Sequence, residues 1–124
     1  MKEECVTYEQ AQALKRLGFR DEVFGYYDEF GRLGINTQTD YNVNWDYFIS
    51  APTLSHAQKW LRENHCLSVE PICNMVRQWN VNVCEIDNFG TAVYSKMNLD
   101  TYELALSAGI DAALELLTDK QTDK

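Results

Sequence analysis

Apolar residues recur at the spacing of a helix in three parts of the chain. Matched against the 3.6-residue period, they predict helices over about residues 7–17, 53–64 and 100–117. Each helix begins at a residue that can cap it. The clearest start is Asp100, with Glu103 at the capping-box position.

Two further segments carry strand patterns. Residues 23–27 are short, β-branched and aromatic, which favours an extended segment. Between residues 67 and 97, Trp79, Val81 and Val83 alternate with polar residues, so one face of a strand is apolar. A proline in the segment before this strand is typical of an edge strand, and Asp, Asn and Gly after it predict an antiparallel hairpin.

The segment between these patterns has no sustained period. Residues 30–44 read FGRLGINTQTDYNVN, with two glycines and several Asn and Thr, which predicts a long irregular loop. Loops of this length are uncommon inside compact domains and are often functional.

The order of elements favours an α+β fold in a single domain of residues 1–124. From residue 53 onward the order is helix, three strands, helix, and both helices can cover the apolar face of an antiparallel sheet. We predict a two-layer sandwich of about three helices on a small sheet of three to four strands, which the strand at 23–27 would extend. With 124 residues, 45% of them hydrophobic, the chain can bury a core without metals or disulfides. The polar residues 118–124 are expected to form a frayed tail.

The charge of the chain argues against two classes of partner. Eleven Lys and Arg against nineteen Asp and Glu give a net charge of -8, which repels phosphate backbones and anionic lipids. The order helix, three strands, helix resembles the double-stranded RNA-binding fold. However, the final helix begins with acidic residues, and no Lys or Arg lies between Met97 and Asp119. We expect neither nucleic-acid binding nor membrane binding.

Localisation and cysteine usage indicate a cytoplasmic protein. The sequence has no apolar run of spanning length, and its first ten residues are charged where a signal peptide is apolar. Free thiols are the default in that compartment. His65, Cys66, Cys73 and Cys84 could be written as a zinc set, but they contain no C-x-x-C pair and adjacent residues on an extended chain point to opposite faces. We expect no metal and no cofactor.

No motif assembles a catalytic set. The sequence has no glycine-rich phosphate loop, no G-x-S-x-G and no H-E-x-x-H. His56 and His65 have no diagnostic spacing to a nucleophile, and the adjacent acids at 21–22 and 28–29 are typical of solvated turns. We predict that the chain is not an enzyme. A thiol–imidazole enzyme would require a Cys and a His within hydrogen-bond distance in a cleft.

Aromatic residues concentrate between Phe24 and Phe48, which hold eight of the fifteen in the chain (three Trp, seven Tyr and five Phe). In one interpretation these rings pack a loop onto the sheet. In the other they form a surface for a protein partner or a flat ligand, because Tyr and Trp offer large contact area with few rotatable bonds. Deep burial of the rings would contradict the second interpretation. The candidate surface residues are Tyr26, Tyr27, Phe30, Arg32, Tyr41, Trp45 and Tyr47.

Three segments together carry a resemblance: TYEQAQALKRLGF followed by VFGYY, then SAPTLSHAQKWLREN, then TYELALSAGIDAALELL. This combination resembles a family of short uncharacterised proteins of gut bacterial genomes, prophages and phages, and it spans most of the chain. Residues 30–44 depart from the family pattern. The resemblance implies a mobile-element origin and a single small cytoplasmic domain, and it carries over no catalytic residues.

Two functions follow as hypotheses. The first is a non-catalytic protein-interaction or accessory protein of phage or prophage origin that holds an unknown protein partner through its aromatic segment. The alternative is a binder of a small aromatic or nucleotide-like ligand, for which Arg16, Arg20 and Arg32 are the nearest cations in sequence. A ligand site should be concave and ring-lined with an Arg nearby, whereas a partner site should be open. A homodimer through a helix or a sheet edge is a further open alternative.

Overall fold

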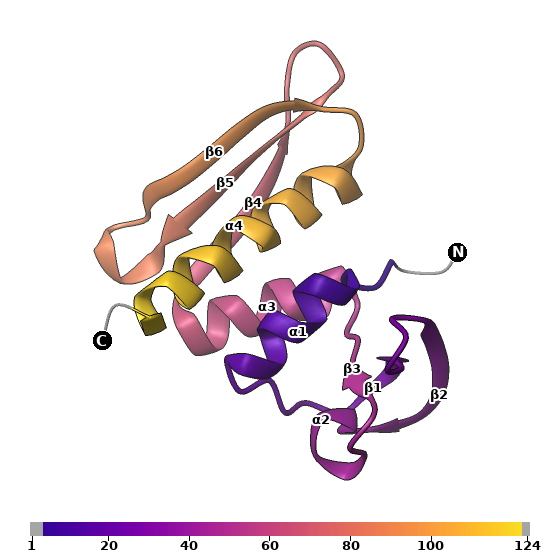
Figure 1. Ribbon diagram of the computed structural model, residues 1–124. Coiled ribbons are helices and arrows are strands. Elements are labelled where there is room, and N and C mark those ends of the chain that lie inside the picture. The colour runs from indigo at the N-terminus through magenta and orange to yellow at the C-terminus, as the bar shows by residue number, and fades with distance from the viewer. Residues whose placement is uncertain (1–3, 123–124) are drawn as a thin grey trace. The chain divides into compact units, whose positions relative to one another are not determined.

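The computed structural model describes residues 4–122, and the chain divides into two compact units, Met1–Thr53 and Leu54–Lys124 (Figure 1). This division differs from the single domain that the sequence predicts. Each unit combines helices with an antiparallel three-stranded sheet, so the α+β class is confirmed. The expected single sheet is replaced by two sheets, because the strand at 23–27 is paired on both sides by its neighbours in sequence.

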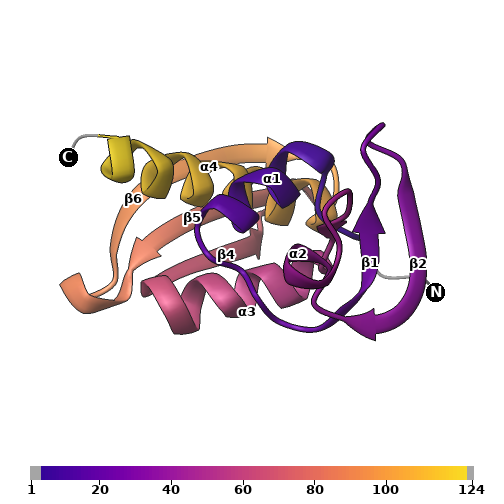
Figure 2. The same cartoon turned by 60° about the horizontal axis from the view of Figure 1, so that its bottom comes forward.

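The first unit consists of one regular helix, a short helix and a sheet in the order β2-β1-β3. Both strand pairs are antiparallel, and β2 lies at the outside of the sheet (Figure 2). In chain order the elements are α1 (Tyr8–Arg16), β1 (Val23–Tyr27), β2 (Leu33–Thr39), α2 (Tyr41–Asn44) and β3 (Ile49–Ser50).

The expected irregular loop at 30–44 is wrong for most of its length. It contains β2 and α2, and β2 forms a hairpin with β1 in which Tyr27 faces Leu33 and Tyr26 faces Gly34. The sequence of β2 lacks a clear alternation of apolar and polar residues. The reason is that β2 is exposed along most of its length, so neither of its faces needs to be apolar.

Helix α1 begins as the sequence predicts. The Thr7 hydroxyl accepts a hydrogen bond from the Gln10 N–H at 3.1 Å, and the Gln10 side chain accepts one from the Thr7 N–H at 2.8 Å. This reciprocal capping box confirms the predicted start. The buried apolar residues of the first unit are Val6, Ala11, Ala13, Leu14, Phe19, Val23, Tyr41 and Ala51.

The second unit has the predicted order of helix, three strands and helix. Its sheet has the order β4-β5-β6, and α3 and α4 lie along one face of it (Figure 1). The edge position of the Pro71 strand and the antiparallel hairpin after Glu85 are both confirmed. The elements are α3 (Leu54–His65), β4 (Leu67–Cys73), β5 (Trp79–Glu85), a 3-10 turn (Ile86–Asn88), β6 (Thr91–Leu99) and α4 (Tyr102–Thr122).

Gly109 lets α4 pack closely on this sheet. A Cβ at this position would lie 2.5 Å from Cγ1 of Val69 and 2.7 Å from Cγ2 of Val81, which are both fully buried. Real side chains do not approach so closely, so the helix can reach this position only without a side chain there.

The ends of α4 differ from the prediction. The Thr101 hydroxyl, rather than the Asp100 carboxylate, accepts from the Leu104 N–H at 3.0 Å, and Asp100 instead accepts from the Gln78 side chain. The helix also continues to Thr122, since the polar residues after Leu117 include no Gly or Pro to stop it. The tail expected at 118–124 is therefore helical to Thr122, and residues 123–124 lie outside the described part.

Candidate functional site

A cavity of about 360 Å³ opens in the first unit beside the edge strand β2. We call it the aromatic hollow. None of the described side chains lining it is charged. They are Tyr26, Asn36, Thr37, Tyr41, Trp45 and Phe48.

Ring contacts connect the four aromatic residues of the aromatic hollow. The Tyr26 ring lies 5.0 Å from that of Tyr41 and 4.7 Å from that of Phe48, and the Trp45 ring lies 5.2 Å from that of Tyr41. All three pairs are tilted by 32° to 37°, within the range of favourable aromatic pairs. The rings therefore support one another and form a preorganised wall.

Gly34 makes room for the ring of Tyr26. The two residues face each other across the β1–β2 pair, and a Cβ at position 34 would collide with the phenol ring of Tyr26. The bare backbone of Gly34 thus leaves room for this ring, which lines the aromatic hollow.

An irregularity in β2 provides the polar part of the wall. Pairing runs from Gly25 opposite Ile35 to Val23 opposite Thr39, so β2 has extra residues at this point. In a regular strand, Asn36 and Thr37 would point to opposite faces, yet both line the aromatic hollow. A bulge of this kind re-aims side chains at sheet edges.

Tyr41 forms the buried floor. Its side chain is only 3% exposed, and its hydroxyl donates to the Thr37 carbonyl at 2.5 Å. Burial raises the pKa of this hydroxyl, and the neighbouring Tyr26 adds to the effect. The hydroxyl therefore stays protonated and works as a donor that ties the short helix α2 to the bulge.

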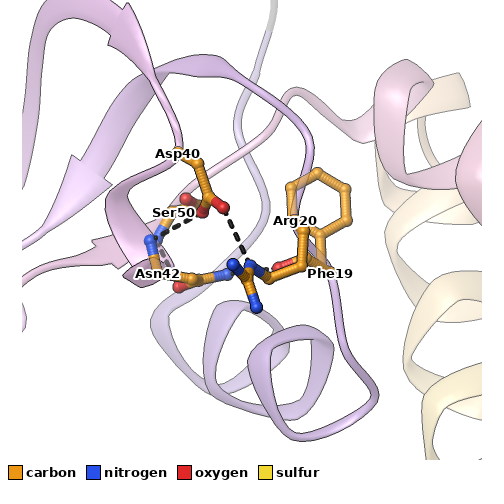
Figure 3. Close-up of polar contacts among 5 residues, drawn as sticks. All are labelled: Phe19, Arg20, Asp40, Asn42 and Ser50. Carbon is orange, nitrogen blue, oxygen red and sulfur yellow. Dashed lines mark hydrogen bonds and ion pairs between the residues drawn. The ribbon is translucent and has the colours of Figure 1, made fainter. Parts of the chain in front are cut away.

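Asn42 fixes the segment that carries Tyr41 and Trp45. Its amide nitrogen donates to the Phe19 carbonyl at 2.8 Å, and its amide oxygen accepts from the Ser50 N–H at 2.9 Å (Figure 3). Asp40 caps the same segment through the Asn42 N–H at 3.0 Å and pairs with Arg20 at 2.9 Å. These bonds connect α2 to the chain after α1 and to β3, and we call them the Asn42 clamp.

The structure brings three of the seven predicted residues together in the aromatic hollow, namely Tyr26, Tyr41 and Trp45. Tyr41 belongs to the core, as the packing interpretation expects, whereas Trp45 is 43% exposed at the rim. The two interpretations of the aromatic segment therefore each describe part of it.

Tyr27 points away from this site. Its hydroxyl donates to the Val6 carbonyl at 2.6 Å, and its ring meets that of Tyr8 edge-on at 5.4 Å. Burial raises the pKa of Tyr27, and Cys5 and Glu9 contribute as well. Tyr27 therefore packs against Val6 and Tyr8 and does not line the aromatic hollow.

Phe30 and Arg32 form the tip of the β1–β2 hairpin. The Arg32 guanidinium lies over the Phe30 ring at 5.1 Å and binds the Asp28 carboxylate at 2.8 Å. The pKa of Asp28 is lowered mainly by the hydrogen bond from the Arg32 backbone N–H. Hydrogen bonds from the Arg32 side chain and the Phe30 N–H add to this effect. These residues stabilise the turn, and Tyr47 is a separate, 70% exposed ring.

Sequence reasoning missed four contributors to the site. Phe48 is one of the eight clustered aromatic residues in the sequence. Asn36 and Thr37 belong to β2, whose sequence shows no alternation of apolar and polar residues. The bonds of Asn42 join residues far apart in sequence, which no local pattern reveals.

A second cavity, of about 310 Å³, lies in the second unit beside His65 and Cys66. The Cys66 thiol donates to the Asp87 carboxylate, and this bond, then burial and the charge of Asp87, raises the pKa of the thiol. Burial lowers the pKa of His65, whose ring contacts Trp60 at 4.9 Å. A nucleophilic thiol needs the opposite shift, so this arrangement does not activate Cys66.

The zinc set His65, Cys66, Cys73 and Cys84 does not assemble. Cys73 lies at the far end of β4 from Cys66, about 20 Å along an extended strand. Within residues 4–122, no three His, Cys, Asp or Glu side chains are grouped to hold a metal ion.

The helices of this part of the chain are too short or too polar to cross a membrane.

Comparisons with protein families, with curated proteins and with solved structures give no match to this chain. The site must therefore be interpreted from its own residues.

Proposed function

We propose that this chain is a small, non-catalytic protein-interaction or accessory protein of the cytoplasm, of mobile-element origin, that holds a partner protein at the aromatic hollow. The observation that carries the proposal is the uncharged, ring-lined wall of this cavity with Trp45 exposed at its rim. Aromatic anchors in such settings dominate protein interfaces. The mobile-element origin rests on the family resemblance alone.

Exposed apolar side chains beyond the cavity favour a partner larger than a metabolite. Phe24 in β1, Leu33 and Ile35 in β2, Val43 and Tyr47 are all well exposed. Monomeric proteins do not normally leave so many large apolar side chains at the surface of one small unit. A partner protein would cover them, whereas a small ligand would leave them in water.

The concave shape supports a second candidate, a binder of a small neutral aromatic molecule. Its size lies at the low end of ligand cavities. An anionic or nucleotide-like ligand fits less well, because Arg20 and Arg32 are each paired with a carboxylate and neither lines the aromatic hollow.

Affinity purification with a matched pair of variants tests the proposal. Wild type, Trp45→Ala and Phe30→Ala are used as bait in a lysate of the host cell, and captured proteins are then tested as purified components by calorimetry. Phe30 is the control because it is an exposed ring at the hairpin tip, outside the aromatic hollow. We expect a protein that binds wild type and Phe30→Ala equally and Trp45→Ala about tenfold more weakly.

Two results would contradict the proposal. Partner binding that Trp45→Ala leaves unchanged would remove the aromatic hollow from the interface. A small molecule retained in native mass spectrometry by wild type and lost by Trp45→Ala would favour the second candidate.

A further inference from the structure

The outer strands of the two sheets differ in how they are protected against pairing with another strand. Natural sheets block their edges with short strands, prolines, charged residues or bulges. β3 is only two residues long, and β4 carries Glu70 and Pro71. β6 carries Lys96 and has two irregularities in its pairing. These three edges are protected.

β2 is the exception among the described edge strands. It is seven residues long, LGINTQT, without a charged residue or a proline. Its bulge lies beyond Ile35, so Leu33, Gly34 and Ile35 stay in regular pairing with β1. Leu33 and Ile35 are 50% and 64% exposed. This part of the edge is regular, apolar and accessible, which is the template that a further strand needs.

The aromatic hollow adjoins this open edge. Asn36 and Thr37 follow Ile35 directly and line the cavity. An added strand that paired along residues 33–35 would therefore pass the aromatic hollow with its next residues. Such binding takes its affinity from main-chain hydrogen bonds and its specificity from a cavity for a side chain.

We propose, on the basis of the proposed function, that an extended and uncharged segment of the partner protein adds as a fourth strand to β2 and places one aromatic side chain in the aromatic hollow. The lack of charge in β2 and in the cavity wall matches an uncharged segment. The four rings of the wall match an aromatic side chain, since offset and edge-on ring pairs are favourable.

A second copy of the chain is a poorer occupant. β2 has no aromatic residue of its own, so pairing between two β2 strands would leave both cavities empty. Two copies would also bring together net charges of -8 each.

The test uses a random library of twelve-residue peptides selected on the wild-type chain. We expect the selected peptides to be uncharged in their core and to share one aromatic residue. Binding is then measured to wild type, Ile35→Lys, Trp45→Ala and Phe30→Ala. Ile35→Lys adds a charge at an exposed edge position that tolerates it, and we expect it to weaken binding about tenfold. Hydrogen exchange should show new protection of the amides in residues 33–36 when peptide binds.

The outcomes separate this inference from the proposed function. Equal binding to Ile35→Lys and wild type, with loss at Trp45→Ala, would overturn strand addition and leave the aromatic hollow as the binding site. Peptides that are insensitive to both substitutions, or a library with no binders, would contradict both. Protection of residues 33–36 in a concentration-dependent dimer without peptide would assign the edge to a second copy and overturn the inference.

Discussion

The two units keep their aromatic and aliphatic side chains in place by different means. In the second unit, α3 and α4 cover one face of the sheet, and Gly109 brings α4 against the buried Val69 and Val81. In the first unit, the short helix α2 supplies Tyr41 to the floor of the aromatic hollow, and the Asn42 clamp holds this helix in place through hydrogen bonds. Tight packing closes a surface, whereas a polar clamp can fix rings and still leave them open to a partner.

Removing the clamp should have the largest effect. Asn42→Ala removes the side-chain hydrogen bonds to the Phe19 carbonyl and from the Ser50 N–H, which should lower the free energy of unfolding by about 2–4 kcal/mol. Urea titration, followed through the indole NMR signal of Trp45, measures this loss. Asn42→Asp keeps the acceptor for Ser50 and should fall between wild type and Asn42→Ala. If Asn42→Ala were as stable as wild type, the clamp would not position this segment.

A side chain at Gly109, where α4 packs against the sheet of the second unit, should cause the next largest loss of stability. Gly109→Ala introduces the Cβ that collides with Val69 and Val81, and we expect a loss of about 1–3 kcal/mol in thermal or urea unfolding. Glu115→Ala, an exposed position on the same helix, is the control and should be nearly neutral. A Gly109→Ala variant as stable as wild type would contradict the close packing of α4 on Val69 and Val81.

A third substitution tests the cost of a buried hydroxyl in the first unit. The Ser50 hydroxyl is fully buried and has no hydrogen-bond partner within residues 4–122. Ser50→Ala removes this unsatisfied group and should stabilise the chain by about 1 kcal/mol. Ser95→Ala, which loses a bond to Asn82 of 2.8 Å, should give no such gain. Destabilisation by Ser50→Ala would indicate an ordered water on the hydroxyl.

The smallest expected effect is the pH dependence that His65 gives to the stability of the second unit. Burial lowers the pKa of His65 from its ordinary value of 6.5, so the unfolded chain binds more protons than the folded chain as the pH falls below that value. The contribution of His65 to stability is therefore present above pH 6.5 and is lost as the pH falls towards the folded pKa. His65→Phe keeps a ring against Trp60 without a titrating group. The stability of wild type relative to this variant should decrease from about pH 7.5 to about pH 5.5. An unchanged difference would mean that His65 is solvated.

The second unit was predictable because its signals are local. Alternation at Trp79, Val81 and Val83 and the helical spacing of apolar residues before and after them define its elements, and the structure keeps their order. The first unit depends on pairing that local patterns do not report. β2 was missed because its side chains are exposed on both faces, and the bulge that aims Asn36 and Thr37 was missed with it.

The prediction of site residues likewise succeeded where the signal was local and failed where it depended on the fold. Clustering of rings found Tyr26, Tyr41 and Trp45, although it could not separate the buried floor from the exposed rim. Tyr27 does not line the aromatic hollow, as the predicted strand at 23–27 already implied, since successive residues of a strand face opposite sides. The hydrogen bonds of Asn42 reach Phe19 and Ser50 through the fold alone.

The contact between Gly34 and Tyr26 constrains how this surface can evolve. The phenol ring occupies the space that any side chain at position 34 would need. A mutation of Gly34 is therefore tolerated only after position 26 has become smaller, and such a change would also remove one wall of the aromatic hollow. In related sequences the two positions should change as a pair. A lineage that lost the glycine would be expected to have given up this binding surface or rebuilt it with a different ring.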